Sequence, residues 1–188
     1  MIWICSSYYG KLPFEVPGTW AWCNFGEVCD YGNCENETPE NIPNDAWILD
    51  LEDIEKDTGR IIAFVSKAER EFYSNKHIFH TGQVLYSNLR PYLNKVLVAP
   101  KNGYCTSEII PLKFNVEMDS GFVRYLLMSS YFLAYANLCS YGVKMPRLGA
   151  TNAKKALIPL PPLNEQKRIA ATITAIYRIL DEITSNTA

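Results

Sequence analysis

The stretch that decides the fold, residues 156–185, reads ALIPLPPLNEQKRIAATITAIYRILDEITS. A short apolar run at its start predicts a strand, and Pro161-Pro162 ends that strand because proline cannot continue a ladder of hydrogen bonds. Asn164 is a good helix N-cap, and Glu165 lies in the first turn, where the helix dipole favours negative charge. The stretch therefore predicts a strand, an abrupt stop and a long helix over residues 165–184.

The predicted helix carries its apolar residues with a strict period. They recur at steps of four, three, four and three, at Ile169, Ile173, Ile176, Leu180 and Ile183. This is the 3.5-residue repeat of a coiled coil, narrower than the apolar stripe of an ordinary surface helix. Only about two and a half heptads are present, so an isolated dimer of such helices would be marginal. The helix either docks on its own domain or leaves the domain to find a partner, and the strict seam favours the second alternative.

Upstream of this stretch, short apolar runs bounded by turn residues predict a β-rich middle. The expected strands lie at residues 61–65, 83–86, 95–99 and 107–112. Before them, Trp47-Ile48-Leu49 suggests the end of a strand followed by a helical turn at residues 50–56. Trp20, Trp22 and Val28 look like anchors at the start of the domain.

Two further helices and two loops are expected. A short helix is predicted over residues 67–73 with Ser66 as its N-cap, and a packed core helix over residues 121–138 with Ser120 as its cap. The expected loops lie at residues 29–45 and 141–153.

The fold class predicted from these elements is α+β. We expect a mixed domain with a small β-sheet core and packed helices at residues 11–160, and a coiled-coil-type helix at residues 161–188. Residues 1–10 show no periodicity and are predicted to form an N-terminal arm.

Length and composition exclude several classes of protein. At 188 residues and 48% apolar composition, the chain can build one hydrophobic core and is not disordered. The most apolar segment, residues 122–138, carries Arg124, two serines and Asn137, and the N-terminus lacks the features of a signal peptide, so neither membrane insertion nor secretion is expected. The six cysteines are Cys5, Cys23, Cys29, Cys34, Cys105 and Cys139. They are expected to be free thiols in a reducing cytoplasm.

The net charge of −2 hides an uneven distribution. Residues 1–60 hold three basic and twelve acidic residues, whereas residues 61–188 hold fifteen basic and eight acidic ones. A folded chain with this split could present a basic face that suits a polyanion. The charges could instead interleave in space, so charge alone does not decide.

The sequence lacks the motifs of the common DNA-modifying enzymes. A methyltransferase acting on bases would carry an Asn/Asp-Pro-Pro-aromatic loop, but here Pro161-Pro162 is flanked by leucines. A restriction-type nuclease would pair an acid with Glu-x-Lys, but Glu165-Gln166-Lys167 opens the last helix. Walker, nucleophile-elbow and dinucleotide-binding motifs are missing too. We therefore expect neither catalytic residues nor a cofactor.

One alternative with catalytic chemistry stays open. Cys29 and Cys34 form one pair and His77 and His80 another, and zinc accepts two cysteines with two histidines. Neither pair has the tight spacing of a zinc finger, so unrelated loop residues are the favoured interpretation and no metal is expected. A small metal-dependent hydrolase built on these four residues is the rival hypothesis.

Three stretches of the chain, residues 11–28, 82–95 and 158–169, resemble the DNA-specificity (S) subunit of type I restriction-modification enzymes. The third is the most specific, because Pro-Leu-Pro-Pro-Leu-Asn-Glu-Gln looks like the block that opens the spacer helix of that family. The likeness extends from Lys11 to Ile183. Full S subunits carry two target-recognition domains and two spacer helices, whereas this chain has one of each. A half subunit, an exchangeable cassette and a fragment all remain open.

The resemblance implies a protein without catalysis of its own. In this family each recognition domain reads one half of a split DNA site, and antiparallel spacer helices set the distance between the halves. The helices also dock the methyltransferase (M) subunit, through which the restriction (R) subunit joins. The expected partners are double-stranded DNA, the M subunit and a second copy, bound through helix 164–185 as a homodimer. A protein-interaction module, in which the helix is the whole function, is a second rival.

Two expected loops and a pair of neighbouring lysines carry side chains of the kind that contact DNA. Phosphates are bound by Lys and Arg, and base edges by Arg, Asn and Gln. The expected DNA-binding residues are Asn88, Arg90, Tyr92, Asn94 and Lys95 in a turn, Lys144 and Arg147 in a basic loop, and Lys154 beside Lys155. A structural ion pair for Arg90 and simple packing for Tyr92 are equally compatible with the sequence.

Overall fold

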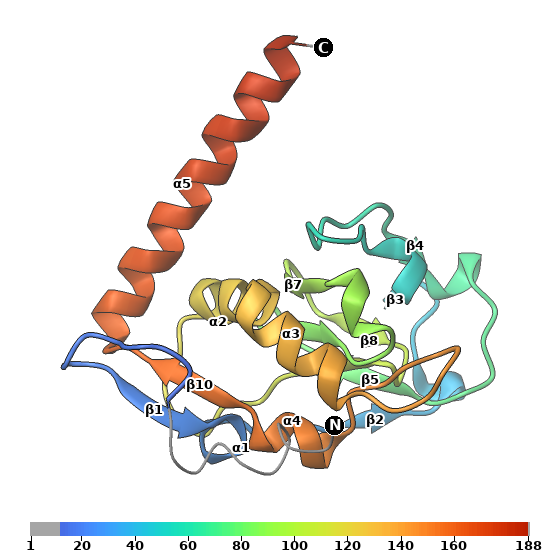
Figure 1. Cartoon of the computed structure of the whole chain (residues 1–188). Coiled ribbons are helices and arrows are strands. Elements are labelled where there is room, and N and C mark those ends of the chain that lie inside the picture. The colour runs from blue at the N-terminus through green and yellow to red at the C-terminus, as the bar shows by residue number, and fades with distance from the viewer. Residues whose placement is uncertain (1–11, 188) are drawn as a thin grey trace.

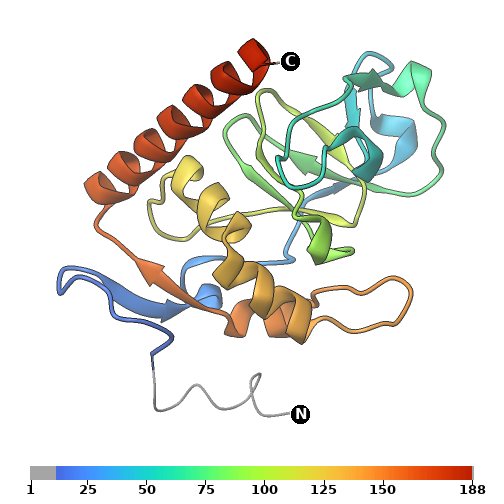
Figure 2. The same ribbon diagram turned by 45° about the horizontal axis from the view of Figure 1, so that its top comes forward.

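The computed structural model describes residues 12–187, which contain ten strands and five α-helices. The α+β class is as predicted, with small sheets, packed helices and a long last helix, α5 (Leu163–Thr187). Helix α5 rises from the edge of the domain, and its C-terminal end stands clear of the rest of the ribbon (Figures 1 and 2). The predicted N-terminal arm, Cys5 and Lys11 lie outside the described residues.

The largest sheet has five strands. In spatial order they are β2 (Asn36–Glu37), β5 (Lys76–Phe79), β8 (Gly103–Cys105), β3 (Trp47–Leu49) and β4 (Val65–Ser66). Neighbours are antiparallel except β3 and β8, which pair in parallel. All three residues of β3 are buried, so this strand anchors the sheet in the core.

A three-stranded antiparallel sheet lies between the larger sheet and the helices. Its strands are β7 (Val96–Val98), β6 (Val84–Ser87) and β9 (Ile109–Pro111). Side chains alternate across the sheet: Leu85 and Leu97 pack with Phe79 of the larger sheet, whereas Val84 and Tyr86 join the core under the helices. Because both faces of β6 are covered, all four of its residues are buried.

The helices and a two-stranded ribbon close the other side of the domain. The helices are α1 (Phe25–Val28), α2 (Ser120–Met128), α3 (Ser130–Cys139) and α4 (Ala150–Lys155). The ribbon pairs β1 (Ala21–Asn24) with β10 (Leu157–Leu160), so segments far apart in the sequence lie side by side just before α5 begins. Trp22 packs edge-on against Phe14, with ring centroids 4.9 Å apart, and its contact with Tyr131 of α3 secures the ribbon.

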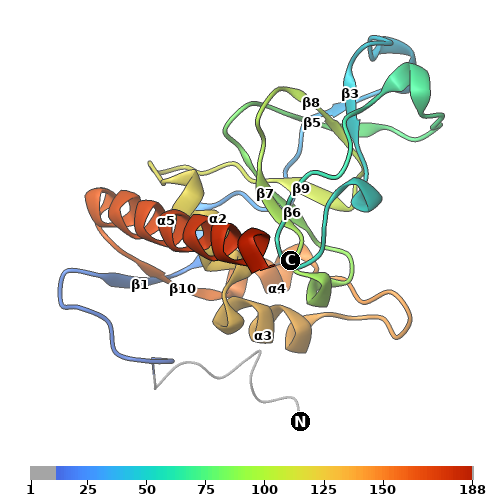
Figure 3. The same ribbon diagram turned by 90° about the horizontal axis from the view of Figure 1, so that it is seen from above.

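Gln166 fixes the base of α5 to the domain. Its side chain is 2% exposed, its amide oxygen accepts from the backbone N–H of Asp119 at 3.0 Å, and its amide nitrogen donates to the carbonyl of Pro161 at 2.9 Å. Asp119 is the N-cap of α2. Nearby, α2 and α5 approach so closely that a Cβ on Gly121 would lie 3.1 Å from that of Ala170. Figure 3 shows α5 running across α2.

The strand predictions were confirmed in part. The strands expected at 83–86, 95–99, 107–112 and 156–160 are present within two residues of their predicted bounds. The strand predicted at residues 61–65 is wrong: Ile61 makes one isolated bridge with Ile54, and β4 begins only at Val65. Apolar side chains favour a strand only where a neighbouring backbone offers partners, and here Ile62 and Phe64 face solvent instead.

Two strands at the centre of the larger sheet were missed. Strand β5 begins at Lys76 and β8 begins at Gly103, and neither lysine nor glycine favours a strand. Gly103 is needed inside the sheet because a Cβ there would lie 2.9 Å from the carbonyl oxygen of Trp47. The loop predicted at residues 29–45 also contains the short strand β2.

The predicted core helix over residues 121–138 is two helices. Ser129 has extended backbone (φ −63°, ψ 150°), and its hydroxyl caps α3 by accepting from the N–H of Phe132 at 3.2 Å. The N-cap of α2 is Asp119 and not Ser120, whose hydroxyl instead donates to the carbonyl of Gly82.

Three other helix bounds differ from the predictions. Ser66 caps a helical turn with Glu69, as expected, but that turn is a 3₁₀ helix ending at Glu69, because Arg70 turns away into a network of charges. The loop predicted at residues 141–153 ends early, where α4 begins at Ala150. Helix α5 begins at Leu163, one residue before the predicted N-cap, a difference within the usual uncertainty of helix ends.

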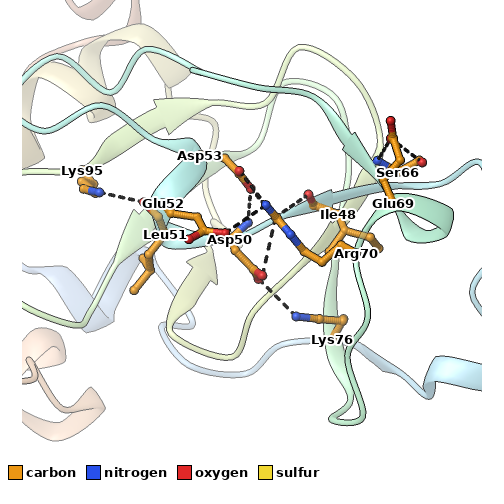
Figure 4. Close-up of polar contacts among 10 residues, drawn as sticks. All are labelled: Ile48, Asp50, Leu51, Glu52, Asp53, Ser66, Glu69, Arg70, Lys76 and Lys95. Carbon is orange, nitrogen blue, oxygen red and sulfur yellow. Dashed lines mark hydrogen bonds and ion pairs between the residues drawn. The ribbon is translucent and has the colours of Figure 1, made fainter.

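That network of charges fixes the segment between β4 and β5 (Figure 4). The guanidinium of Arg70 pairs with both carboxylate oxygens of Asp53, which is 4% exposed, and lies 3.5 Å from Asp50. It also donates to the carbonyl of Ile48 in β3 at 3.3 Å. Lys76, also 4% exposed, binds the other oxygen of Asp50 at 3.1 Å. Chiefly because of its hydrogen bond to Asp53, the pKa of Arg70 is raised.

Removing Arg70 would leave Asp53 buried without its cation. We therefore expect the R70A variant to lose about 3–5 kcal/mol of unfolding free energy. The R70K variant keeps the charge but not the two-pronged pairing, and should lose less. Urea unfolding followed by tryptophan fluorescence measures both changes. An R70A variant as stable as the wild type would show that the network contributes nothing to stability.

Candidate nucleic-acid interface

The two loops that the sequence singled out lie against each other. They are the Arg90 turn (residues 87–95), which begins at the end of β6, and the basic loop (residues 141–149), which precedes α4. Two backbone hydrogen bonds, from Arg90 to Pro146 (2.7 Å) and from Leu148 to Asn88 (3.0 Å), join them and form a β-bridge between Leu89 and Arg147. The turn and the loop therefore form one surface.

Arg147 and Lys144 play different parts in the basic loop. The guanidinium of Arg147 pairs with the carboxylate of Glu108, so it holds the loop in place. Lys144 lies exposed at the tip and, among the described residues, makes neither an ion pair nor a hydrogen bond. Its ammonium group is therefore available to an outside anion such as a phosphate.

Arg90 has a strained backbone. Its φ of +49° and ψ of 62° are left-handed, a conformation that is costly for a residue with a side chain. Its Nε is buried and has no hydrogen-bond partner in the described structure, and the same holds for Oδ1 of Asn88. Strain together with unpaired polar atoms is typical of functional sites, where a ligand completes the bonding.

The second half of the Arg90 turn is tied to the domain. The side-chain amide of Asn94 donates to the carbonyl of Met128 at 3.1 Å. The ammonium group of Lys95 donates to the carbonyl of Leu51 at 2.7 Å, and burial lowers the pKa of Lys95 below its ordinary value. Both side chains thus have structural partners. Tyr92 is half-exposed and stays accessible.

Lys154 is not brought together with the two loops. It lies in α4 against α1, where a Cβ on Gly26 would be 2.7 Å from that of Lys154. Its ammonium group pairs with Asp30 at 3.3 Å. Lys155 is exposed at the end of the same helix.

Sequence reasoning missed three side chains of the basic loop. Tyr141, Val143 and Met145 are exposed, Val143 completely. Apolar groups in the grooves of DNA, such as the thymine methyl, are natural contacts for such side chains. The sequence did carry a signal: an apolar residue stands at every second position, 141, 143 and 145, of a loop that also contains Gly, Lys and Pro.

The residues of the metal-dependent rival do not form a site. Cys29 is fully buried, and burial raises its thiol pKa to about 12. Burial likewise raises the pKa of Cys34 to about 11, and Nδ1 of His77 lies 2.9 Å from the carbonyl oxygen of Ile109. Within residues 12–187, no three His, Cys, Asp or Glu side chains are grouped so that they could hold a metal ion.

The bonding state of the cysteines differs from the expectation at one residue. Cys23, Cys29, Cys34 and Cys105 are free thiols, as predicted. Cys139 is disulfide-bonded, so the expectation of free thiols is wrong for this residue. Spacing along a sequence does not show which thiols a fold brings within bonding distance, so composition could not reveal this.

One face of α5 packs on its own domain. Its residues follow each other at steps of four, three and four: Ala170, Thr174, Tyr177 and Asp181. Tyr177 stacks on Tyr125 of α2 with ring centroids 6.0 Å apart, and the hydroxyls of Tyr125 and Thr174 are 3.0 Å apart. Asp181 pairs with Arg60 at 2.7 Å, an exposed contact that adds little stability.

The predicted heptad seam lies on a neighbouring face and divides into two halves. Ile169 and Ile173 are partly buried near the domain. Beyond them, every side chain from Thr174 to Ser185 is exposed. The apolar residues there form the distal strip, Ile176, Ile179, Leu180 and Ile183, each about half-exposed. The lower half thus docks on its own domain, as one alternative held, and the side chains of the distal strip are about half-exposed.

Replacing Arg90 with glycine separates the two possible roles of this residue. Glycine adopts a positive φ without strain, so R90G should keep or raise the unfolding free energy, by up to about 1 kcal/mol. The same change removes the guanidinium and should weaken binding to duplex DNA. Thermal unfolding and a gel-shift titration measure the two effects. A variant that is less stable and binds DNA unchanged would make Arg90 a structural residue.

Comparison with known proteins identifies the family. Residues 17–187 match the family model for the type I restriction modification DNA specificity domain. The chain is 29% identical over 173 residues to the type I restriction enzyme EcoDI specificity subunit of Escherichia coli, covering 92% of this chain and 38% of that protein. It is 28% identical over 202 residues to the EcoEI specificity subunit of the same organism, covering 93% and 32%.

A solved structure shares the fold. The HsdS subunit from Thermoanaerobacter tengcongensis superposes with a TM-score of 0.76 at 24% identity, over 92% of this chain and 46% of that one. The chain therefore spans less than half the length of these relatives. Within the described residues, no helix is long and apolar enough to cross a membrane. The expected family is confirmed: this chain belongs to the type I restriction-modification DNA specificity domains, and its described residues form one domain followed by one long helix.

Proposed function

We propose that this chain reads one half of a split DNA site as the specificity component of a type I restriction-modification complex in the cytoplasm. The observation that carries the proposal is the surface formed by the Arg90 turn and the basic loop. It combines a strained arginine, unpaired polar atoms and an exposed lysine. Membership of the specificity-domain family supports DNA as the ligand.

The groups on this surface divide between two kinds of DNA contact. Lys144 supplies a point charge at a loop tip, which suits a phosphate. Arg90 and Asn88 carry the guanidinium and amide groups that are suited to purine edges. Val143 and Met145 supply apolar contacts. Arg147, bound to Glu108, keeps the loop in position.

Pairing of two copies follows from the distal strip. A single recognition domain binds only one half-site, whereas two domains joined by a helix pair bind the second half-site intramolecularly and gain affinity without new contacts. The strip is apolar, exposed and spaced for a second helix. We propose an antiparallel homodimer about a two-fold axis, which would read a palindromic split site.

The same helix pair offers the docking place for the methyltransferase subunit. No catalytic motif is found in the sequence, so methyl transfer and cleavage must come from other subunits. In this proposal the M subunit binds along α5, and the R subunit joins through it. The relatives of this chain are specificity subunits of type I restriction enzymes, which supports assembly with other subunits of such an enzyme.

The salt dependence of binding tests the role of Lys144. Each phosphate contact contributes about 0.9 to the slope of log affinity against log salt concentration. We expect K144A to reduce this slope by about that amount, and K155A, a matched change on α4, to leave it unchanged. Fluorescence anisotropy with the chain assembled on its M subunit measures the slopes. Equal slopes for K144A and the wild type would place the phosphate contact elsewhere.

The oligomeric state tests the distal strip. The double variant I176D/L180D places two charges in the proposed helix pair, and we expect it to sediment as a monomer at micromolar concentration. The wild type should sediment as a dimer. The control A171D/A175D adds the same charges at exposed positions off the strip and should stay dimeric. A wild type that is monomeric under these conditions would refute pairing through α5.

A further inference from the structure

A second loop projects on the same side of the molecule as the basic loop. This is the Tyr73 loop (residues 71–75), which leads into β5. In Figures 1, 2 and 3 both loops stand on the side away from the base of α5, and Figure 3 shows them at opposite ends of that side. Tyr73 is 90% exposed, and its neighbours Ser74 and Asn75 are exposed too.

The Tyr73 loop is held rigidly at both ends. Arg70 precedes it, and its guanidinium binds Asp53 and, at 3.2 Å, Glu52. Lys76 follows it, with its ammonium group on Asp50 and 4.6 Å from the ring centroid of Phe72. These ion pairs restrain the backbone on both sides of the loop, because breaking a buried pair leaves an uncompensated charge. An exposed tyrosine is thus presented on a loop of defined shape.

The same network determines what the loop can recognise. Arg70 and Lys76 are both bound to carboxylates, so neither cation next to the loop is free for a phosphate. The exposed groups that remain are the carboxylate of Glu71, two hydroxyls and the amide of Asn75. Without a free cation the loop forms no ion pair with the phosphates of DNA, and the carboxylate of Glu71 is repelled by them. Amides pair with adenine, and carboxylates accept from the amino group of cytosine, so these groups suit base edges.

We propose that the Tyr73 loop is a second base-reading arm, which contacts the same half-site as the Arg90 turn and the basic loop from the opposite end of the recognition face. The inference rests on the proposed function and adds a division of labour to it. Lys144 holds the phosphates and supplies affinity, whereas Tyr73 and Asn75 contribute to the choice of sequence.

Selection from a pool of randomised DNA duplexes tests the proposal. The full chain, assembled with its M subunit, is compared with Y73A/N75A, which changes two exposed side chains and should unfold at the wild-type temperature. We expect the variant to lose discrimination by roughly 5- to 100-fold at one or two base positions. Its preference elsewhere, and the salt dependence of its binding to the unselected pool, should not change. K144A should give the reverse pattern.

The possible results distinguish a failure of the role proposed for the Tyr73 loop from a failure of the proposed function. Identical motifs for the wild type and Y73A/N75A would overturn the role of the Tyr73 loop and leave the proposed function intact. The same conclusion would follow if the variant kept the motif but lost its M subunit, since the loop would then be a protein contact. A wild type that enriches no motif would overturn the proposed function and this inference with it.

Discussion

The buried amide of Gln166 is the contact on which the rest of the structure depends. It binds the backbone at the cap of α2 and at the end of β10, so that two elements of the domain and α5 meet at one side chain. Leaving such an amide unpaired would cost about 1–3 kcal/mol. Because a helix is stiff and rises about 1.5 Å per residue, fixing its base also fixes where its far end lies relative to the recognition surface.

This constraint gives the two faces of α5 separate tasks. The face with Thr174 and Tyr177 keeps the helix on its own domain, and the distal strip is the face that we propose for pairing with a second copy. A flexible connection would let two paired domains sample many separations, and the effective concentration of the second domain at its half-site would fall. In the proposed pair, a rigid junction converts the geometry of one chain into a fixed distance between two half-sites. The specificity of the assembly then includes the spacing as well as the bases.

Patterns along the sequence predicted the features that depend mainly on neighbouring residues. The apolar period of α5 predicted a long helix, the apolar run of β6 predicted a buried strand, and the composition of the two loops marked them as candidates for DNA contact. The sequence did not show contacts between distant segments. The nearby carbonyl of Trp47 requires a glycine at position 103 in β8, and the helix predicted over residues 67–73 ends early because Arg70 binds Asp53. The sequence likewise could not show that Glu108 occupies Arg147, or that the Arg90 turn and the basic loop share one surface.

The most direct measurement is the affinity of the chain for duplexes that carry two inverted half-sites at increasing separation. A junction fixed by Gln166 and a pairing through the distal strip predict one preferred separation. Binding should weaken when a single base pair is added or removed, because this shifts the half-sites by about 3.4 Å and rotates them by roughly 35°. Equal affinity at every separation, or a lone half-site bound as tightly as the pair, would contradict the account.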